Sequence, residues 1–200
     1  MSLREQRERR AARDSHKDLV MIQILAFVLS TLFATSASTN ANAVTLAVST
    51  KKNIMELRVG SKVIHRYDVS VGKKAHPTPQ GTYAVNHIVW NPAWNPPKEK
   101  WAKGKKPTAP GDEKNPMKVV KIFFKEPDYY IHGTGDEEAL GGAASHGCIR
   151  MSQRDAFNLG RYLMDHGGAE KPASWYSGVF NRGTSADVRL KSSAKIIIGP

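Results

Sequence analysis

Apolar and polar residues alternate along most of the chain after residue 43, and this pattern predicts a protein built mainly of β-strands. A period of two places successive side chains on opposite faces, so that one face of a strand can be buried. Glycines and prolines at the ends of several segments supply the turns between them. We expect strands at 44–48, 53–59, 63–71, 82–90, 119–124, 129–131, 187–190 and 195–198.

One helix is expected after residue 152. Ser152 is a good N-cap, and Asp155 three residues later completes a capping-box pattern. The apolar residues that follow at helical spacing are Ala156, Leu159 and Leu163. The glycine pair at 167–168 ends this helix.

The segment 91–116 breaks the strand pattern, because it contains most of the prolines and many lysines. Long proline-rich loops in compact domains are often functional. Trp94 and Trp101 lie within it and Trp90 at its start, which favours an ordered flap beside a site. The alternative is a loop held to its own core by these aromatic residues.

The N-terminus has the pattern of an export signal. Residues 1–18 are charged with basic residues in excess, and residues 19–37 are largely apolar. Ala41-Asn42-Ala43 then matches the small-x-small pattern of a signal-peptidase site. We therefore expect 1–43 to be a signal peptide, or alternatively an uncleaved membrane anchor, and 44–200 to be one exported domain in the periplasm or cell envelope.

The net charge of +12 on 200 residues predicts an anionic environment or partner. Nucleic acid is not expected, because no recognition helix, zinc-finger spacing or aromatic RNA-binding signature accompanies the charge. Acidic polymers of a bacterial envelope fit the charge better. Contact with a membrane is expected only through the N-terminal segment.

Candidate chemistry is concentrated around Cys148, the single cysteine of the chain, which also rules out an intramolecular disulfide. A lone cysteine is often only a small buried hydrophobe. This one instead follows Gly147 in a polar stretch, and His132 and His146 are available as bases. With backbone N–H groups of Gly147 and Cys148 as donors to an oxyanion, the pattern indicates covalent acyl transfer.

Four ordered motifs carry a resemblance to a known family. They are Pro77 to Tyr83, Pro110 to Asp112 with Asn115 to Met117, His132-Gly133-Thr134, and Ser145 to Met151. Over about 44–166 the chain resembles the L,D-transpeptidase catalytic domain, or YkuD family. The resemblance implies a β-sandwich, mainly β with a short α-helix, in which the catalytic cysteine lies on a loop before that helix. The connection 167–186 is longer and more irregular than the usual ending of the family.

The resemblance also implies roles for individual residues. Cys148 would be the nucleophile, His132 the general base, and the Gly133 carbonyl the group that orients the imidazole. Substrate-binding residues would be Ser145, His146 and Arg150, to which the flap would add Trp94. No cofactor or metal is implied. The substrate would be a peptidoglycan tetrapeptide stem, which loses D-alanine while its acyl group passes through a thioester to an amine.

Several alternatives stay open at this point. His146 could replace His132 as the base, and His132, His146 and Cys148 could instead be ligands of a zinc ion. Water as the acceptor would make the enzyme an L,D-carboxypeptidase, and a wall-attached protein as the acceptor would make it a tethering enzyme. A noncatalytic peptidoglycan-binding module is a further alternative. The remaining histidines, at 65, 76, 87 and 166, have no partner pattern and are expected at the surface or at strand ends.

Overall fold

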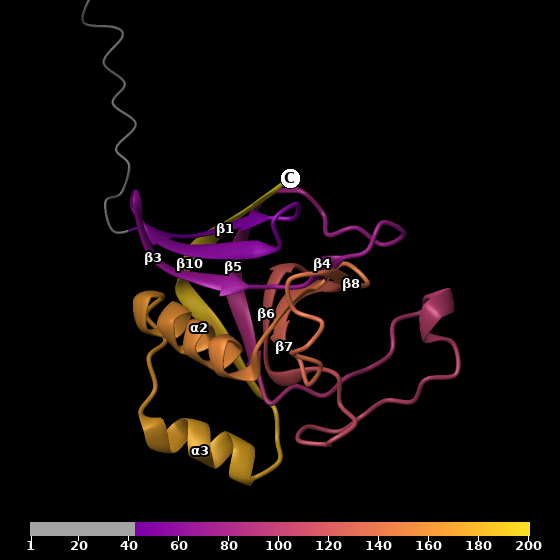
Figure 1. Ribbon diagram of the computed structural model, residues 1–200. Coiled ribbons are helices and arrows are strands. Elements are labelled where there is room, and N and C mark those ends of the chain that lie inside the picture. The colour runs from indigo at the N-terminus through magenta and orange to yellow at the C-terminus, as the bar shows by residue number, and fades with distance from the viewer. Residues whose placement is uncertain (1–42) are drawn as a thin grey trace, which may run out of the picture. The chain divides into compact units, whose positions relative to one another are not determined.

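A computed structural model describes residues 43–200 (Figure 1). The expected signal peptide or membrane anchor, apart from Ala43, lies outside the described residues. Among the described residues, no helix is both long enough and apolar enough to span a membrane.

The order of elements agrees with the expected strand-rich pattern. The strands are β1 (Val44–Ser49), β2 (Ile54–Val59), β3 (Lys62–Asp68), β4 (Val71–Gly72), β5 (Gly81–Trp90), β6 (Lys118–Lys125), β7 (Tyr129–Gly133), β8 (Ala143–Ser145), β9 (Ile149–Met151) and β10 (Ala186–Gly199). The helices are the 3-10 turn η1 (Lys100–Ala102), α2 (Gln153–His166) and α3 (Ala173–Asn181). The flap of residues 91–116 therefore carries one short turn of helix and no strand.

Within the described residues, eight strands form one mixed sheet in the order β3-β2-β1-β10-β5-β6-β7-β9, and β4 pairs with β8 separately. Strands β5 and β10 belong to both halves of the large sheet. Residues 194–198 of β10 pair with the first half of β5, whereas residues 186–189 pair with its second half, next to β6. The pairing register shifts between Arg189 and Ala194, and such an irregularity bends a strand.

The bend lets both halves of the sheet bury one shared core. Leu46 and Met55 from the β1–β2 half belong to the same buried cluster as Ile131 and Ile149 from the β7–β9 half. Helix α2 supplies residues to this cluster as well, and Figure 1 shows it lying along the sheet. The fold is therefore the mainly β, layered architecture that was expected.

Helix α2 begins as the sequence predicts. The Ser152 hydroxyl accepts a hydrogen bond from the Asp155 N–H at 3.0 Å, and it donates one to the Asp155 carboxylate at 2.8 Å. Leu159 and Leu163 are buried on the inner face of the helix. Because β9 leads into this helix within two residues, the N-terminus of α2 fixes the end of the segment that carries Cys148.

The position of Trp90 at the start of segment 91–116 suggested that this residue belongs to the flap. The structure places it in the core instead. It is fully buried, and its ring packs edge-on against Phe157 and Tyr176. Gly160 of α2 permits this contact, since a Cβ at that position would lie 2.9 Å from the Trp90 ring. The absence of a side chain at residue 160 therefore makes room for the largest side chain of the core.

We expect Gly160→Ala to destabilise the fold, although alanine is the better helix former. The gain in helix propensity of about 1 kcal/mol is opposed by overpacking against Trp90, which costs about 1–3 kcal/mol. Urea unfolding of the full chain measures the balance. In the double variant with Trp90→Phe, the penalty of Gly160→Ala should shrink. An equal penalty in both backgrounds would show that the ring contact is not its cause.

The closing part of the chain differs from the expectation in two respects. The connection 167–186, expected to be irregular, contains helix α3, and the two short closing strands are one long strand, β10. Helix α3 lacks the usual sequence signals, because Pro172 gives no side-chain cap and Gly178 lowers the helix propensity of the segment. It is held by tertiary contacts instead, since Tyr176 and Val179 are buried against the core.

The sequence predicted His87 to lie at the surface or at a strand end, but the structure buries it. It is only 8% exposed, and its ring nitrogens lie 3.0 Å from Glu126 and 2.9 Å from Asp187. Its ring stacks on Phe123 of the neighbouring strand at 4.6 Å. The acidic partners come from distant segments, so no local pattern could reveal them.

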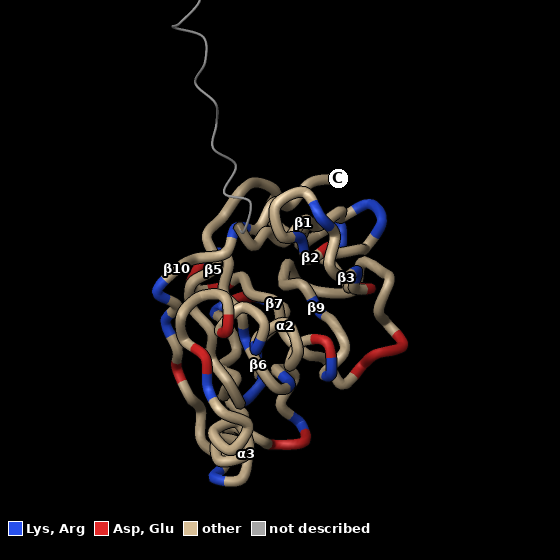
Figure 2. Tube along the Cα trace, turned by 90° about the vertical axis from the view of Figure 1, so that its left-hand side faces the viewer, with Lys and Arg blue, Asp and Glu red and all other residues tan. Residues whose placement is uncertain are grey.

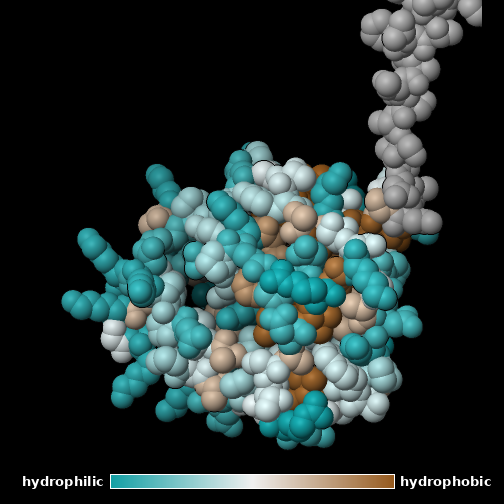
Figure 3. Space-filling view, turned by 180° about the vertical axis from the view of Figure 1, so that it is seen from behind, coloured by the Kyte–Doolittle hydropathy of each residue, from teal (hydrophilic) through white to brown (hydrophobic). Residues whose placement is uncertain are grey.

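Charged residues are spread widely over the domain. Lys and Arg positions occur along the whole described trace with acidic positions among them (Figure 2). In the view from behind, most of the surface is hydrophilic, and long polar side chains project on the side where the flap lies (Figure 3). The excess of positive charge is thus a general property of the surface, to which the flap of residues 91–116 adds six lysines against three acidic residues.

Candidate functional site

Residues from separate motifs meet on one face of the sheet, because β6, β7 and β9 are neighbours. His132 of β7 pairs with Lys121 of β6 on one side and with Arg150 of β9 on the other. Residues paired across adjacent strands share a face, so these three side chains form a row. The opposite face carries Ile122 and Ile131, which are fully buried in the core.

Tyr130 and Cys148 extend this arrangement by one position. Tyr130 precedes His132 by two residues and therefore shares its face of β7. Cys148 lies immediately before β9, at the height of Tyr130 in the parallel register. The sequence interpretation named neither Tyr130 nor Lys121. The spacing of two between Tyr130 and His132 was available as a signal, whereas the pairing of Lys121 with His132 required the register.

These side chains line a pocket of about 1100 Å³ on the side of the flap. The expected site residues that line it are Trp94, His132, Ser145, His146, Cys148 and Arg150. Gly133 and Gly147 do not line it, so any part they play is through the backbone. The structure thus brings into one cavity all the side chains that were predicted to act together.

The imidazole of His132 is held in one orientation. Its Nδ1 lies 2.9 Å from the Gly133 carbonyl oxygen, and because a carbonyl only accepts, Nδ1 carries the proton. The pKa of His132 is lowered to about 4, chiefly by burial and also by the nearby charges of Arg150 and Lys121, while the hydrogen bond to Gly133 acts in the opposite direction. The ring is therefore neutral near pH 7, with the lone pair on Nε2.

The Cys148 thiol is protonated at rest. Its Sγ lies 3.4 Å from the Asp128 carbonyl oxygen, to which the thiol donates. Burial raises the pKa of Cys148 to about 11, although hydrogen bonds from Tyr130 and the charges of Lys121 and Arg150 act in the opposite direction. A neutral thiol and a neutral imidazole thus occupy the pocket, in place of a preformed ion pair.

The loop before Cys148 is braced by its own hydrogen bonds. The Ser145 hydroxyl donates to the Cys148 carbonyl at 2.5 Å and accepts from the Gly147 N–H at 3.0 Å. Gly147 has a φ of +109°, which favours glycine, and a Cβ there would lie 2.8 Å from the Tyr129 ring. In this arrangement the Gly147 N–H is directed at Ser145, and not at the pocket.

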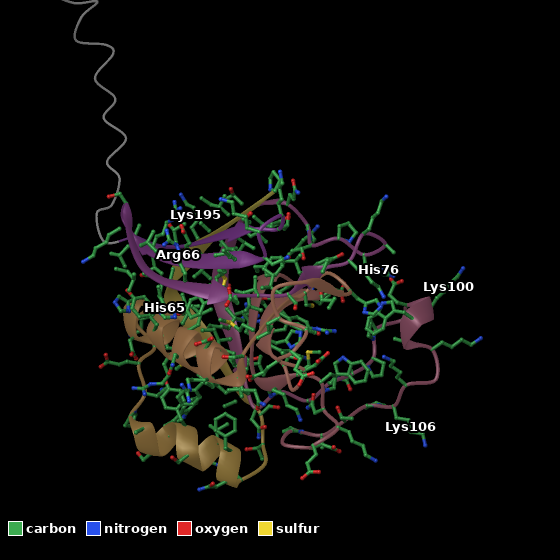
Figure 4. The ribbon with its side chains drawn as sticks, in the orientation of Figure 1. His65, Arg66, His76, Lys100, Lys106 and Lys195 are labelled. Carbon is green, nitrogen blue, oxygen red and sulfur yellow. The ribbon has the colours of Figure 1, made fainter. Side chains whose placement is uncertain are left out.

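The flap is fastened to the site through aromatic contacts. The Trp101 ring stacks on the His146 ring with their centres 4.0 Å apart, and the centre of the His76 ring lies 4.9 Å from the centre of the same His146 ring. Figure 4 shows His76 on the side of the molecule that faces η1 and the labelled flap lysines. Trp94 is 7% exposed and exchanges two backbone hydrogen bonds with Thr108, so the flap is ordered around its own tryptophans.

The burial of neutral His132 predicts a loss of stability in acid. Its pKa is about 4 in the folded state and about 6.5 in the unfolded chain, so the unfolded state binds more protons between these values. The contribution of neutral His132 to the free energy of unfolding is fully present above pH 6.5. It is lost as the pH drops towards 4, and the loss amounts to about 3 kcal/mol. Urea unfolding at pH 7 and pH 4 should show this loss, and His132→Asn should reduce it. An unchanged pH dependence in that variant would assign the acid sensitivity to other groups.

Comparison with known proteins gives a consistent result. The family model of the L,D-transpeptidase catalytic domain, YkuD, matches residues 43–172. Over 117 residues the chain is 32% identical to YqjB of Bacillus subtilis, assigned as an L,D-transpeptidase, which covers 56% of this chain and 61% of that protein. Over 114 residues it is 26% identical to YkuD of Bacillus licheniformis, assigned likewise, which covers 57% of this chain and 56% of that protein. The chain thus spans between half and two thirds of the length of these relatives.

The fold has a counterpart among solved structures. An L,D-transpeptidase from Mycobacterium smegmatis superposes with a TM-score of 0.51 at 17% identity, covering 79% of this chain and 59% of that chain. At this identity the likeness concerns the fold alone, and it confirms the mainly β architecture. Since the family model matches well over half of the residues, the chain belongs to the L,D-transpeptidase catalytic domain family.

Proposed function

We propose that this protein is an exported cell-wall L,D-transpeptidase in which Cys148 attacks the peptidoglycan tetrapeptide stem. The observation that carries the proposal is the placement of Cys148 in one pocket with His132, whose Nδ1 is fixed on the Gly133 carbonyl. This orientation leaves Nε2 as the free basic nitrogen. A thiol and an oriented neutral imidazole are the two groups that covalent acyl transfer requires.

The reaction would begin with transfer of the Sγ proton to Nε2 of His132. For this the thiol must leave the Asp128 carbonyl by rotating about its Cβ–Sγ bond. As this proton moves, sulfur forms a bond to the stem carbonyl carbon, and the tetrahedral intermediate then collapses as the C–N bond breaks. The imidazolium returns its proton to the departing amine of D-alanine. An acceptor amine next attacks the thioester and gives a proton to His132, and the imidazolium passes this proton to the departing sulfur, so that the thiol and the neutral imidazole are restored.

Because both groups are neutral at rest, proton transfer and attack would occur together, with the bound substrate in place. A neutral His132 suits this role, since an imidazolium could not accept the proton. Burial likewise keeps the free enzyme from exposing a reactive thiolate. The low proton affinity of His132 then favours rapid return of the proton to the leaving group.

The oxyanion would be bound by the backbone N–H of Cys148. The second expected donor, Gly147, gives its N–H to Ser145 in the resting arrangement, so the loop would have to shift slightly on substrate binding. Loss of one oxyanion donor typically costs about 10²–10³ in rate. Ser145 would act chiefly by bracing the loop, because its hydroxyl is hydrogen-bonded to the Cys148 carbonyl and to the Gly147 N–H.

Recognition of the stem would involve Arg150, His146 and Trp94 along the pocket. Arg150 provides a cation for a substrate carboxylate. Its backbone is fixed by two hydrogen bonds to Ser70, at 2.8 and 2.9 Å, which hold β9 against the segment before β4. His146 is occupied by stacking on Trp101, which suits a wall of the pocket better than the general base.

An exported location would agree with the charge of the chain and with the proposed substrate. The net charge of +12 favours an envelope rich in acidic polymers. The acceptor amine would come from a second stem or from a wall-attached protein. The N-terminal segment would supply the only contact with a membrane.

Intact mass spectrometry of the full chain with a purified tetrapeptide stem fragment tests the proposed function. The wild type should form an acyl adduct and release D-alanine, whereas Cys148→Ala should do neither. Adding candidate amines then identifies the acceptor, and release of free tripeptide without an added amine would indicate carboxypeptidase activity. Folded wild-type protein that gives no adduct and no product would refute the proposal.

A further inference from the structure

Lys121 occupies an unusual position for a lysine, on the pocket face of a central strand. It lies on β6, directly opposite His132 of β7. Its Nζ is 3.0 Å from the Ala93 carbonyl oxygen at the base of the flap and 5.0 Å from the centre of the Tyr130 ring. The side chain is half-buried and lines the same pocket as Cys148. Lysine is rarely placed in this way without a partner.

The ammonium of Lys121 has no carboxylate partner among the described residues. The salt bridges there involve Glu56 and the Glu126–Asp187 group around His87. Titratable and charged groups near the sulfur on the sheet side are Asp128, Tyr130, His132, His146 and Arg150. The flap contributes Lys98, Glu99 and Lys105 to the pocket. A half-buried cation in the same pocket as the thiol thus has a carbonyl and an aromatic face as its contacts.

We propose that Lys121 is a positioning residue that stabilises the negative charge developing on the Cys148 sulfur and ties the base of the flap to the active site. This inference rests on the proposed function, whose reaction places negative charge on the sulfur. A carbonyl and an aromatic ring hold the ammonium in place without neutralising it. Its charge is therefore available to an anion formed in the pocket, where the low dielectric strengthens the attraction.

The environment of Tyr130 supports this role. The Tyr130 ring packs edge-on against His132 at 5.6 Å and against Phe123 at 5.2 Å, so its position is fixed from both sides. Burial raises the pKa of Tyr130, and proximity to Cys148 raises it further, so its hydroxyl stays protonated and can donate to the sulfur. Lys121 and Tyr130 together present one charge and one hydrogen-bond donor to the thiolate.

The hydrogen bond to the Ala93 carbonyl gives Lys121 a second role. Ala93 immediately precedes Trp94, whose backbone pairs with Thr108 inside the flap. The lysine therefore joins β6 to the rigid part of the flap at the point where the pocket opens. Replacing the charge while keeping a hydrogen-bond donor should separate the electrostatic effect from this tether.

The rate of Cys148 alkylation by iodoacetamide as a function of pH tests the proposal on the full chain without any substrate. Iodoacetamide forms a carbon–sulfur bond with the thiolate and loses iodide, so the rate follows the thiolate fraction. Lys121→Met should slow alkylation by about tenfold at each pH below the thiol pKa, because an opposite charge nearby shifts a pKa by about one unit or more. Lys121→Gln should behave alike, and Lys121→Arg should restore most of the rate.

Lys125 provides a matched control from the same strand. Its Nζ lies 5.5 Å from the Tyr129 ring, a contact like that of Lys121, but Lys125 is exposed and does not line the pocket. Lys125→Met should leave the alkylation profile unchanged. If Lys125→Met caused the same slowing as Lys121→Met, a general charge effect would replace the proposed local one.

Further outcomes overturn the inference. A folded Lys121→Met or Lys121→Gln with the wild-type profile would show that the charge does not act on the sulfur. A slow Lys121→Arg would show a purely structural role. If Lys121→Met fails to fold, Lys121→Gln provides the same readout with a hydrogen-bond donor kept at this position. Activity on the tetrapeptide stem distinguishes this proposal from the proposed function. If the wild type had no activity on the stem but Lys121→Met still alkylated more slowly than the wild type, the role of Lys121 would be supported and the proposed function refuted.

Discussion

Cys148→Ala is expected to abolish acyl transfer, with turnover falling by about 10⁴-fold or more to the background rate. Removal of a catalytic nucleophile costs this much because no other group can form the covalent intermediate. Cys148 is the single cysteine of the chain, so no neighbouring thiol can substitute. The measurement is the rate of D-alanine release from a tetrapeptide stem, accompanied by the intact mass of the protein.

The same substitution should leave the fold almost unchanged. The Cys148 side chain is half-buried, and its hydrogen bond runs to the Asp128 carbonyl at 3.4 Å, so its removal should cost at most about 1 kcal/mol. Cys148→Ser is a useful companion, since its hydroxyl preserves the shape but ionises far less readily. Substantial activity in either variant, or unfolding of Cys148→Ala by circular dichroism, would show that this thiol is structural and not the nucleophile.

His132→Asn is expected to slow acylation of Cys148 by about 10²–10⁴-fold. The asparagine amide can keep the hydrogen bond that Nδ1 of His132 makes to the Gly133 carbonyl, but it lacks the basic Nε2 nitrogen. The loss should therefore report the missing base, and not a misplaced side chain. Single-turnover acylation, followed by the intact mass of the protein, gives this rate directly.

His146→Ala is the control, because His146 lies in the same motif and the same pocket. Its ring stacks on Trp101, so its loss should loosen the flap and weaken substrate binding, with a smaller effect on acylation of about tenfold or less. A larger effect at His146 than at His132 would mean that the base has been assigned to the wrong histidine. Equal losses in both variants would point to the pocket as a whole.

Local sequence patterns predicted most of the elements around the site. The short apolar runs at 119–124 and 129–131 located β6 and β7, and Ser152 with Asp155 located the start of α2, because both signals depend on neighbours along the chain. Helix α3 was missed for the opposite reason. Its aromatic residues are stabilised by contacts with Trp90 and Phe157, which lie far away in the sequence.

The candidate site divides in the same way. Cys148, His132 and Arg150 stand in recognisable motifs, so the sequence by itself determined the family of the protein and predicted Cys148 as the nucleophile and His132 as the base. Tyr130 and Lys121 carry no motif, and they join the site through the register of β6, β7 and β9. The register between β6 and β7 shifts twice along the pair, and β9 pairs with β7 from a separate segment. The protonation of the half-buried thiol and the buried imidazole depends on the desolvation that these pairings produce. Only the tertiary structure could decide these features.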